Sequence, residues 1–304
     1  MKILFLSEEF PPENTGGAGV IAYNLAHELN SIGHDIFVIV RTDKKSEVGE
    51  VKFNGLKVFR IYGSYHPRWQ SWFSLYNPLM ISKIKKIIKK IKPDVIHAHN
   101  IHYYFSYYSL KLAKKYSKAV FLTVHDVMPI NFGKLLPKTD KYIYKISIAE
   151  QIANAGKRYN PFRNLLIRHY LKYIDKIFTV SDSLKKILEI NGIGNTETIY
   201  NGINVDEWQV DKEKVDKFKD KYDLKEKMVI IFSARLIEAK GGDQLIRALA
   251  LVNKKFLDFV LLVVGKEWAY TEKLKKISQR LGIGGKLIFT GYLKEEELKL
   301  AYNS

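Results

Sequence analysis

Cysteine is absent from this chain of 304 residues. That absence excludes disulfide bonds, thiolate metal sites and a cysteine nucleophile, and it fits a reducing compartment. Long apolar runs are absent as well, because none approaches the roughly 20 residues that a membrane-spanning helix needs. The apolar run 3–6 is too short for a signal peptide and is followed by Ser7, Glu8 and Glu9. We therefore expect a cytosolic (cytoplasmic) protein.

Acidic residues are scarce relative to basic ones, with 32 Asp and Glu against 50 Lys and Arg, which gives a net charge of +18. Such an excess favours polyanionic partners, namely nucleic acid, anionic lipid or phosphorylated small molecules. The alternative is ordinary lysine scattered over the surface. No helix-turn-helix, zinc or RNA-binding pattern is visible, so we predict no nucleic-acid partner.

Short apolar runs alternate with helical patterns along the chain. The runs are rich in Val, Ile and Phe and mostly lack strict alternation, which is typical of strands buried on both faces of a parallel sheet. Strands are predicted at 2–7, 35–40, 56–62, 94–99, 119–125, 176–181 and 197–201, and again at 228–234, 259–265 and 286–292. Helices are predicted at 20–29 and 242–254, where apolar residues recur at helical spacing. This repetition predicts a doubly wound α/β fold.

The strand pattern stops between about 203 and 227, where a highly charged stretch predicts a linker and then a surface helix. We place a domain boundary there, which gives a first domain of residues 1–205 and a second of residues 206–304. The second domain has only three predicted strands before Ser304.

A glycine-containing loop separates the first strand from the first helix. Gly16 and Gly17 stand where that helix begins, so free N–H groups and the helix dipole favour a phosphate or a sugar hydroxyl there. A tight turn packed on the sheet is the alternative. Gly17, Gly19 and Ala22 also match the dinucleotide fingerprint, with Asp43 as its acidic residue, but the stretch EEFPPENT makes the loop too long for it. Nicotinamide binding is therefore the minor alternative.

A second candidate phosphate site follows the predicted strand 228–234. Arg235 and Lys240 come directly after that strand, and Gly241 and Gly242 open the next helix. Open α/β sheets bind ligands at the carboxyl ends of their strands. The arginine fork, the lysine charge and the helix N-terminus can together neutralise a diphosphate, with a solvated loop as the alternative. One such loop in each domain suggests a ligand held between the domains.

Residues 81–92 form the clearest cluster of charge. Isoleucines share one face of the predicted helix and lysines cover the other, beside an aromatic stretch with Trp69, Trp72 and Phe73. The stretch 157–176 adds further cations. The pattern indicates either an ordinary helix with a solvated lysine face or peripheral contact with an anionic membrane, on its inner face.

Several stretches occur in an order that resembles one family of enzymes. The chain is similar to retaining nucleotide-sugar glycosyltransferases of family four, and the stretches that carry the likeness are EEFPPENTGGAGVIAYNLAHELNSIGHDIFVIV, KPDVIHAHN, TVHD, IFTVSDSLKKIL, IYNGINVDEW, SARLIEAKGGDQLIRAL and LLVVGKE. The resemblance implies the GT-B fold, in which two Rossmann-like domains face a cleft. Family members continue beyond the stretch that ends this chain with a loop that carries two donor-binding glutamates, so we expect a truncated member with an incomplete second domain and weak donor binding.

The resemblance also implies roles for residues of the first domain. Gly16 and Gly17 resemble the glycine loop near the diphosphate and the acceptor. His125 resembles the histidine that contacts the transferred sugar, with Asp126 beside it. Asn201 resembles the turn that enters the interdomain hinge.

In the second domain, Arg235 and Lys240 resemble the cation pair that holds the donor diphosphate. With His125 they are the catalytic residues that the resemblance implies. The loops that line the nucleotide pocket correspond to Gly265, Lys266, Tyr292 and Leu293.

The implied reaction moves a sugar from a nucleotide diphosphate to an acceptor hydroxyl, on a sugar or a lipid-linked molecule, with retention of configuration. We expect no cofactor and no metal, since no aspartate pair is spaced for Mg²⁺. A metal site at His97, His99 and His102 is the minor alternative to a polar strand end. We interpret Glu8 and Glu9 as a solvated strand end rather than as active-site acids. The competing functions are a non-catalytic nucleotide-sugar or polyanion binder and a sugar-nucleotide epimerase.

Overall fold

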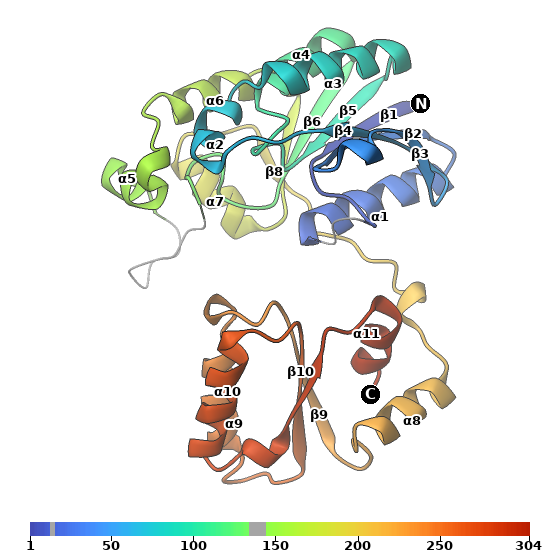
Figure 1. Ribbon diagram of the computed structural model, residues 1–304, viewed down its shortest axis with the longest axis vertical. Coiled ribbons are helices and arrows are strands. Elements are labelled where there is room, and N and C mark those ends of the chain that lie inside the picture. Colours follow the sequence, from blue (N-terminus) through green and yellow to red (C-terminus); the bar gives the residue numbers. More distant parts are fainter. Residues whose placement is uncertain (13–15, 134–143) are drawn as a thin grey trace. The chain divides into compact units, whose positions relative to one another are not determined.

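The computed structural model describes residues 1–12, 16–133 and 144–304. These residues form two compact units, Met1–Ile203 and Asn204–Ser304. Each unit has a sheet of parallel strands with helices packed against it (Figure 1). Within the described ranges, no helix is both long and apolar enough to cross a membrane.

The N-terminal unit is built on an eight-stranded sheet in the order β3-β4-β2-β1-β5-β6-β7-β8. All neighbouring strands are parallel except β3 and β4. The strands are β1 Lys2–Ser7, β2 Asp35–Thr42, β3 Gly49–Phe53, β4 Leu56–Tyr62, β5 Val95–His99, β6 Ala119–Val124, β7 Lys176–Thr179 and β8 Thr196–Thr198. The predicted α/β class with a largely parallel sheet is thereby confirmed.

The sheet differs from the predicted strands at two places. The strand expected at 197–201 is the shorter β8, and β3 was not predicted because its charged residues hide a strand pattern. The Asn54-Gly55 pair was the available signal for β3. These two residues join β3 to β4, and their φ angles of 46° and 82° are those that a tight two-residue hairpin turn requires.

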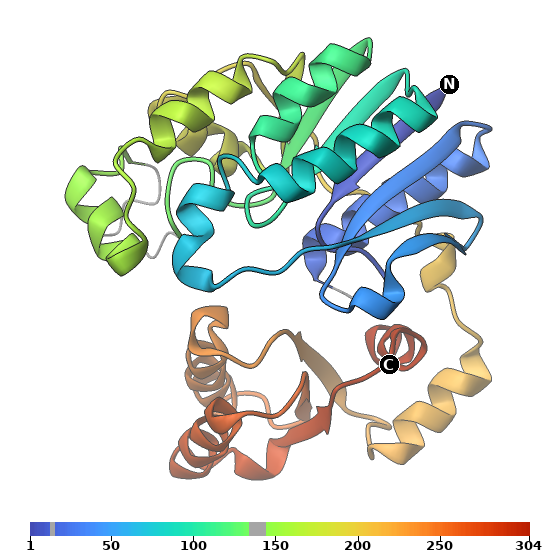
Figure 2. The same ribbon diagram turned by 45° about the horizontal axis from the view of Figure 1, so that its top comes forward.

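Helices cover both faces of the N-terminal sheet. They are α1 Gly17–Ser31, α2 Gln70–Phe73, α3 Pro78–Ile91, α4 Tyr108–Tyr116, α5 Ile148–Ala155, α6 Arg163–Leu171 and α7 Asp182–Ile190, with short 3₁₀ turns η1 Lys45–Glu47, η2 Pro67–Trp69 and η3 Gly156–Arg158. Helices α1 and α3 lie on opposite faces of the sheet (Figure 1). Helices α3, α4 and α6 lie side by side in one layer (Figure 2).

Alternating side chains of β1 pack into the hydrophobic cores on the two faces of the sheet. Leu4 and Leu6 pack with the α3 side, whereas Ile3 and Phe5 pack with α1. This is the period of two that a strand imposes on its side chains. Because both faces are apolar, the sequence reads as a continuous hydrophobic run.

Helix α3 confirms the predicted amphipathic helix. It begins after Asn77, whose side chain accepts the N–H of Met80, and Pro78 occupies its first position. Ile84 and Ile88 are completely buried, and each contributes about 1.5–3 kcal/mol of hydrophobic stabilisation. The lysines of the helix lie on its other side and are mostly exposed.

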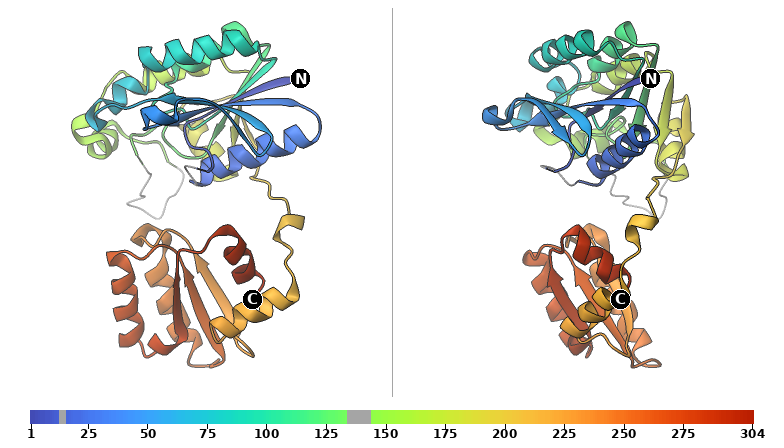
Figure 3. Two further views of the ribbon diagram at one scale, coloured as in Figure 1. Left: turned by 45° about the vertical axis from the view of Figure 1, so that its right-hand side comes forward. Right: turned by 90° about the vertical axis from the view of Figure 1, so that its right-hand side faces the viewer.

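The C-terminal unit is built on a smaller parallel sheet in the order β11-β10-β9, which confirms its three predicted strands. The strands are β9 Met228–Ser233, β10 Phe259–Val264 and β11 Leu287–Gly291. The helices are α8 Lys212–Lys221, α9 Gly242–Val252, α10 Ala269–Arg280 and α11 Glu295–Tyr302, with 3₁₀ turns η4 Asp206–Trp208, η5 Glu238–Lys240 and η6 Gly284–Lys286. Helices α9 and α10 pack on one face, and α8 and α11 on the other (Figure 3).

Gly265 follows β10 directly, where the loop after β9 passes closest. Its φ is +156°, and a Cβ atom added to it would lie 2.2 Å from the carbonyl oxygen of Ala234. Its N–H donates to the carbonyl of Gly291 at 3.0 Å. Only glycine fits this position, and the contact fixes the backbone one residue before Arg235.

The variant Gly265→Ala is expected to lower the free energy of unfolding by at least about 2 kcal/mol, because the new methyl group would collide with the backbone. Gly285→Ala is the matched control, since no atom lies within 4 Å of its added Cβ. Urea unfolding followed by circular dichroism measures both variants. Equal midpoints for the two variants would contradict the close approach at Gly265.

Candidate active site

Polar side chains gather at the carboxyl ends of three neighbouring strands in the N-terminal unit. The parallel register places Ser7 of β1 beside His99 of β5, and His99 beside Thr123 of β6. Glu8 and His125 each follow closely after their strand. This edge therefore holds an acid and several histidines, in the position where open α/β sheets bind ligands.

The histidines form a buried, hydrogen-bonded array. His99 Nδ1 lies 3.1 Å from His125 Nε2, and His97 Nε2 lies 2.8 Å from Thr123 Oγ1. Burial lowers the pKa of His125 to about 4 and that of His97 to about 3, and it also holds the pKa of His99 well below its usual value. All three rings are therefore neutral at pH 7, so each offers one N–H donor and one acceptor nitrogen.

His102 and Asp126 form the next part of this edge. Asp126 Oδ1 accepts the N–H of Met128 at 2.9 Å, and Asp126 Oδ2 lies 3.7 Å from His102 Nε2. His102 is 3% exposed, and its burial lowers its pKa. The structure thus brings Asp126 and His125, which the sequence singled out, next to a histidine that the sequence suggested only as a metal ligand.

Glu8 corrects the expectation of a solvated strand end, because it is only 6% exposed. Its Oε1 accepts the N–H groups of Tyr104 and Phe105 at 2.7 Å each, and Tyr103 N–H lies 3.2 Å from both carboxyl oxygens. Burial raises the pKa of Glu8 to about 8, against the effect of these three N–H groups. Glu8 therefore ties the end of β1 to the loop that carries His102.

The glycines at the start of α1 divide into two kinds. Gly16 is the N-cap residue and α1 begins at Gly17, where an added Cβ would meet no atom within 4 Å. At Gly19, by contrast, a Cβ would lie 2.8 Å from the carbonyl oxygen of Glu9. Packing therefore requires Gly19, while the backbone at Gly17 stays accessible. The loop residues 13–15 of this predicted site lie outside the described residues.

Arg235 and Lys240 lie in the loop that joins β9 to α9. Both side chains are exposed, and neither forms an ion pair within the described part of the chain. Glu238, the acidic residue between them, is paired with Lys273 of α10. Gly241 adopts the left-handed conformation with φ 78° and turns the chain into α9 without a side-chain cap. The loop thus presents two unpaired cations next to a helix N-terminus.

Four further predicted residues follow the ends of β10 and β11. Gly265 gives the close backbone approach described above, and Lys266 Nζ lies 5.1 Å from the ring centroid of Trp268. Tyr292 is 67% exposed, whereas Leu293 is buried in the core with Phe218 and Ala301. Among the residues expected to line a nucleotide pocket, Tyr292 is thus presented to solvent and the side chain of Leu293 is not.

Asn201 lies in the segment between β8 and η4 and is exposed. It makes no side-chain hydrogen bond within the described ranges. Its predicted role at a hinge stays a prediction. In the described residues, no group of three or more His, Asp or Glu side chains is arranged to hold a metal ion.

Sequence reasoning missed two features of the N-terminal site. One is the burial of the Glu8 carboxyl. The only sequence feature that indicated it was the apolar run that precedes Glu8. The other is the burial of Arg163, which was counted among the surface cations of 157–176. Its spacing from Ile167 and Leu171, four and eight residues later on the same helical face, was a usable signal.

Solved structures of similar proteins show which fold this is. HepE of Anabaena, crystallised in complex with UDP, superposes with a TM-score of 0.64 at 18% identity, and the match covers 99% of this chain and 71% of HepE. The paired Rossmann-like units are therefore those of the GT-B fold, as expected.

The chain belongs to the glycosyltransferases. Residues 15–207 match Glycosyltransferase Family 4 and residues 214–304 match Glycosyl transferases group 1. An uncharacterized glycosyltransferase of Methanocaldococcus jannaschii is 27% identical over all of this chain and 73% of its own length. Alpha-monoglucosyldiacylglycerol synthase of Streptococcus pneumoniae is 22% identical over all of this chain and 64% of its own length.

Glu8→Gln tests the buried carboxyl, because glutamine keeps an oxygen for the three N–H groups but does not titrate. Between its ordinary pKa of 4.5 and about 8, Glu8 is ionised in the unfolded chain and protonated in the folded one. Ionisation of Glu8 therefore lowers stability as pH rises through this window, by up to about 1.4 kcal/mol per pH unit, and the variant lacks this contribution. The stability difference between variant and wild type should grow in the variant's favour from pH 6 to pH 8.

Urea unfolding at several pH values measures this difference, and the depressed histidines cancel in it because both proteins carry them. Glu9→Gln is the control for the change in net charge, since Glu9 is partly exposed. A difference that stays constant across this range would show that Glu8 is ionised when folded.

Proposed function

We propose that this chain transfers a sugar from a nucleotide diphosphate donor to an acceptor hydroxyl, with retention of configuration and without a metal. The observation that carries the proposal is the cation pair Arg235 and Lys240, which is exposed at a strand end and unpaired within the described residues. The family assignment supports the reaction class. The complex of HepE with UDP supports a nucleotide diphosphate as the first ligand to test.

In the proposed reaction the bond between the sugar C1 and the diphosphate oxygen breaks, and a bond from C1 to the acceptor oxygen forms on the same face. The acceptor proton passes to the departing phosphate oxygen, so no side chain acts as nucleophile. Arg235, Lys240 and the N-terminus of α9 stabilise the charge that grows on the diphosphate. A preorganised donor of this kind lowers the barrier by about 3 kcal/mol.

His125 is proposed to bind the transferred sugar. Its low pKa keeps the ring neutral, so it acts as a hydrogen-bond partner rather than as a charge. When its Nε2 accepts from His99 Nδ1, its own Nδ1–H is left to donate to a sugar hydroxyl. The exposed Gly17, together with Gly16 before it, is proposed to approach the donor or the acceptor. Lys266 and Tyr292 are proposed to line the nucleotide pocket.

The double variant Arg235→Ala, Lys240→Ala is expected to weaken the binding of the preferred nucleotide among UDP, GDP and ADP at least 100-fold. Any transfer rate that the chain shows should fall by about 10²–10³-fold. Lys254→Ala, Lys255→Ala removes two exposed cations from the same unit and is the matched control.

Isothermal titration calorimetry without metal measures the binding, and release of free nucleotide from nucleotide-sugars measures transfer. Equally weak binding of all three nucleotides to the wild type and to the double variant would contradict the donor-site proposal. Specific binding without turnover would instead favour a non-catalytic binder.

We further propose that the N-terminal unit rests on an anionic membrane through the layer of α3, α4 and α6. These three helices contain lysines and arginines but no acidic residue. Lys90, Lys114 and Lys118 are paired with acids from other elements, while Lys85 and Lys86 are exposed without an ion pair in the described ranges. The name of the pneumococcal relative, a glucosyldiacylglycerol synthase, supports a lipid acceptor.

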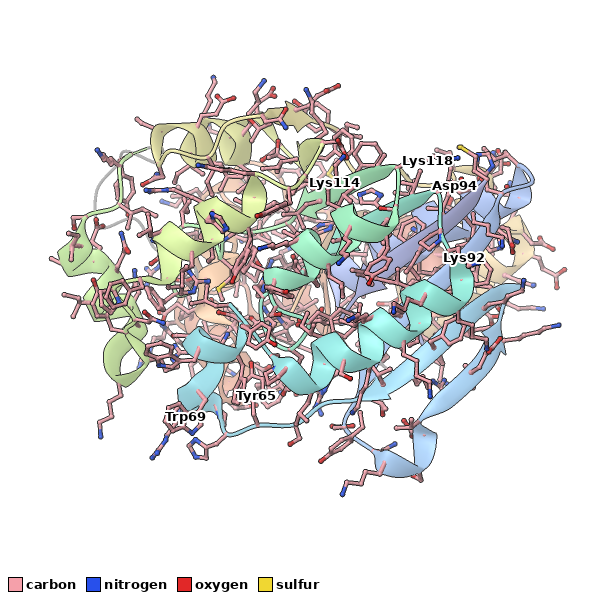
Figure 4. The ribbon with its side chains drawn as sticks, turned by 90° about the horizontal axis from the view of Figure 1, so that it is seen from above. Tyr65, Trp69, Lys92, Asp94, Lys114 and Lys118 are labelled. Atoms are coloured by element: carbon pink, nitrogen blue, oxygen red, sulfur yellow. The ribbon has the colours of Figure 1, made fainter. Side chains whose placement is uncertain are left out.

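The surface of this layer has an aromatic end and a basic end. In Figure 4, Trp69 projects at one end and Lys92 lies at the other. Trp69, Trp72, Tyr76 and Leu79 are 45–73% exposed. These residues follow the carboxyl end of β4, whereas Lys92 precedes the amino end of β5. The apolar side chains therefore lie at the end of the layer nearer the candidate site, as a lipid-borne acceptor would require.

The double variant Lys85→Glu, Lys86→Glu should weaken binding to vesicles that contain phosphatidylglycerol by tenfold or more, since each lysine near an anionic surface contributes about 1 kcal/mol. Lys185→Glu, Lys186→Glu on α7, a helix that also carries Asp182 and Glu189, makes the same change in net charge. Cosedimentation with phosphatidylglycerol vesicles and with pure phosphatidylcholine vesicles measures the effect. Equal losses in the two variants would mean that net charge, and not this layer, drives the association.

A further inference from the structure

Arg163 is a buried cation without a buried anion. It opens helix α6, is only 1% exposed, and shares its helical face with Ile167 and Leu171. Its Nη2 donates to the carbonyl of Met128 at 2.6 Å and its Nη1 to Asn164 Oδ1 at 3.0 Å. Neither oxygen carries a charge, and no carboxylate lies within ion-pair distance among the described residues. The ring of Phe132, whose centroid lies 4.7 Å from Cζ, compensates part of the charge. A buried guanidinium that lacks a carboxylate partner remains costly.

A second guanidinium borders the same space. Arg158 and Arg163 both line a small cavity of about 10 Å³ that opens to solvent, so a larger group can reach the two side chains only at its mouth. Arg158 donates to Gln70 Oε1 at 2.8 Å, which is again a neutral acceptor. Most of the ten guanidinium N–H groups therefore have no acceptor in the described part of the chain.

His102 adds an unpartnered polar atom to the wall of this cavity. Its Nε2 is buried and makes no hydrogen bond, since Asp126 Oδ2 lies at 3.7 Å. Asp126 itself is 38% exposed at its side chain and is bound to the N–H of Met128. The cavity wall thus combines two arginines and a buried histidine nitrogen, and the Asp126 carboxylate lies beyond hydrogen-bond distance of that nitrogen.

Helix α2 connects this cavity to the outer surface. Gln70 and Ser71 of α2 line the cavity, while Trp69 before it and Trp72 within it are exposed. Ser71 donates to the carbonyl of Arg158, which fixes α2 against η3. The exposed tryptophans are therefore direct chain neighbours of residues in the cavity wall.

We propose that the solvent-open mouth of this cavity, beside Arg158, binds a phosphoryl group carried by the acceptor. Phosphate oxygens suit arginine donors that converge from two elements, and they supply the negative charge that the site lacks. The identity of the anion as part of an acceptor rests on the proposed function, whereas binding of the anion itself does not. The phosphoryl group comes either from a lipid headgroup or from a soluble phosphate ester.

Glycerol 3-phosphate is the probe for the soluble case, titrated by calorimetry into the full chain with uncharged glycerol as the blank. The expected result is saturable binding that Arg158→Gln weakens at least fivefold. Arg168→Gln is the matched control, because Arg168 lies on the same α6 but donates to the carbonyl of Asn191 and does not line the cavity. Cosedimentation of the same variants with phosphatidylcholine vesicles that contain phosphatidic acid tests the lipid case.

Failure of this site and failure of the donor site are distinguishable. Arg158→Gln should leave UDP, GDP and ADP binding unchanged, and Arg235→Ala, Lys240→Ala should leave glycerol 3-phosphate binding unchanged. The proposal is overturned if neither probe binds, if Arg158→Gln and Arg168→Gln behave alike, or if the Arg235 and Lys240 variant loses the probe. Weakening of vesicle binding alone by Arg158→Gln assigns the phosphoryl group to a lipid, and weakening of glycerol 3-phosphate binding alone assigns it to a soluble ester.

Arg163→Met tests the buried charge itself. If Arg163 is held for a ligand, its removal leaves the melting temperature of the ligand-free chain equal or higher and abolishes the rise that glycerol 3-phosphate causes in the wild type. If Arg163 is instead a structural tie for Met128 and Asn164, the melting temperature of the ligand-free variant falls. Arg158→Gln, whose parent side chain is only partly buried, decides the question if Arg163→Met does not fold.

Discussion

The free-energy cost of holding a charge in the protein interior is the constraint on which the N-terminal site depends. Three kinds of buried ionisable group meet this constraint in different ways. The histidines of β5 and β6 give up their charge, Glu8 takes up a proton while three N–H groups hold its oxygens, and Arg163 keeps its charge against neutral oxygens. The first two solutions are complete within the chain. The third leaves Arg163 over the ring of Phe132 without a carboxylate partner among the described residues, which is the reason for proposing an anion there.

The C-terminal unit differs because its candidate charged groups are not buried. Its candidate ligand groups, Arg235 and Lys240, are exposed, so water solvates them until a ligand replaces it. What this unit makes rigid is the backbone beneath them, through the contact of Gly265 with Ala234 and the left-handed turn at Gly241. In the proposed site, exposed charges on a fixed loop would meet a diphosphate, whereas the polar groups of the N-terminal site are mostly buried.

Much of the fold could be predicted because buried parallel strands and amphipathic helices leave strong periodic signals. The stripe of isoleucines in α3 and the apolar run of β1 are examples. Strand β3 could not be predicted from the sequence, because a half-exposed edge strand with Glu50 and Lys52 has little hydrophobic signal. The positions of His125 and Asp126 at a strand end followed from the pattern, but the burial of Glu8 did not. That burial depends on Tyr103–Phe105, a segment nearly a hundred residues away, and such long-range contacts leave no local pattern.

The acid-free layer of α3, α4 and α6 has a consequence for how an association with a charged surface would respond to salt. At physiological ionic strength, exposed charges are screened over about 8 Å. The lysines of the layer therefore act only when the surface is almost in contact, and their attraction weakens as salt is added. The layer has few apolar side chains at one end and lysines along the rest. It is therefore suited to reversible membrane binding, and the lifetime of the bound state would depend on ionic strength.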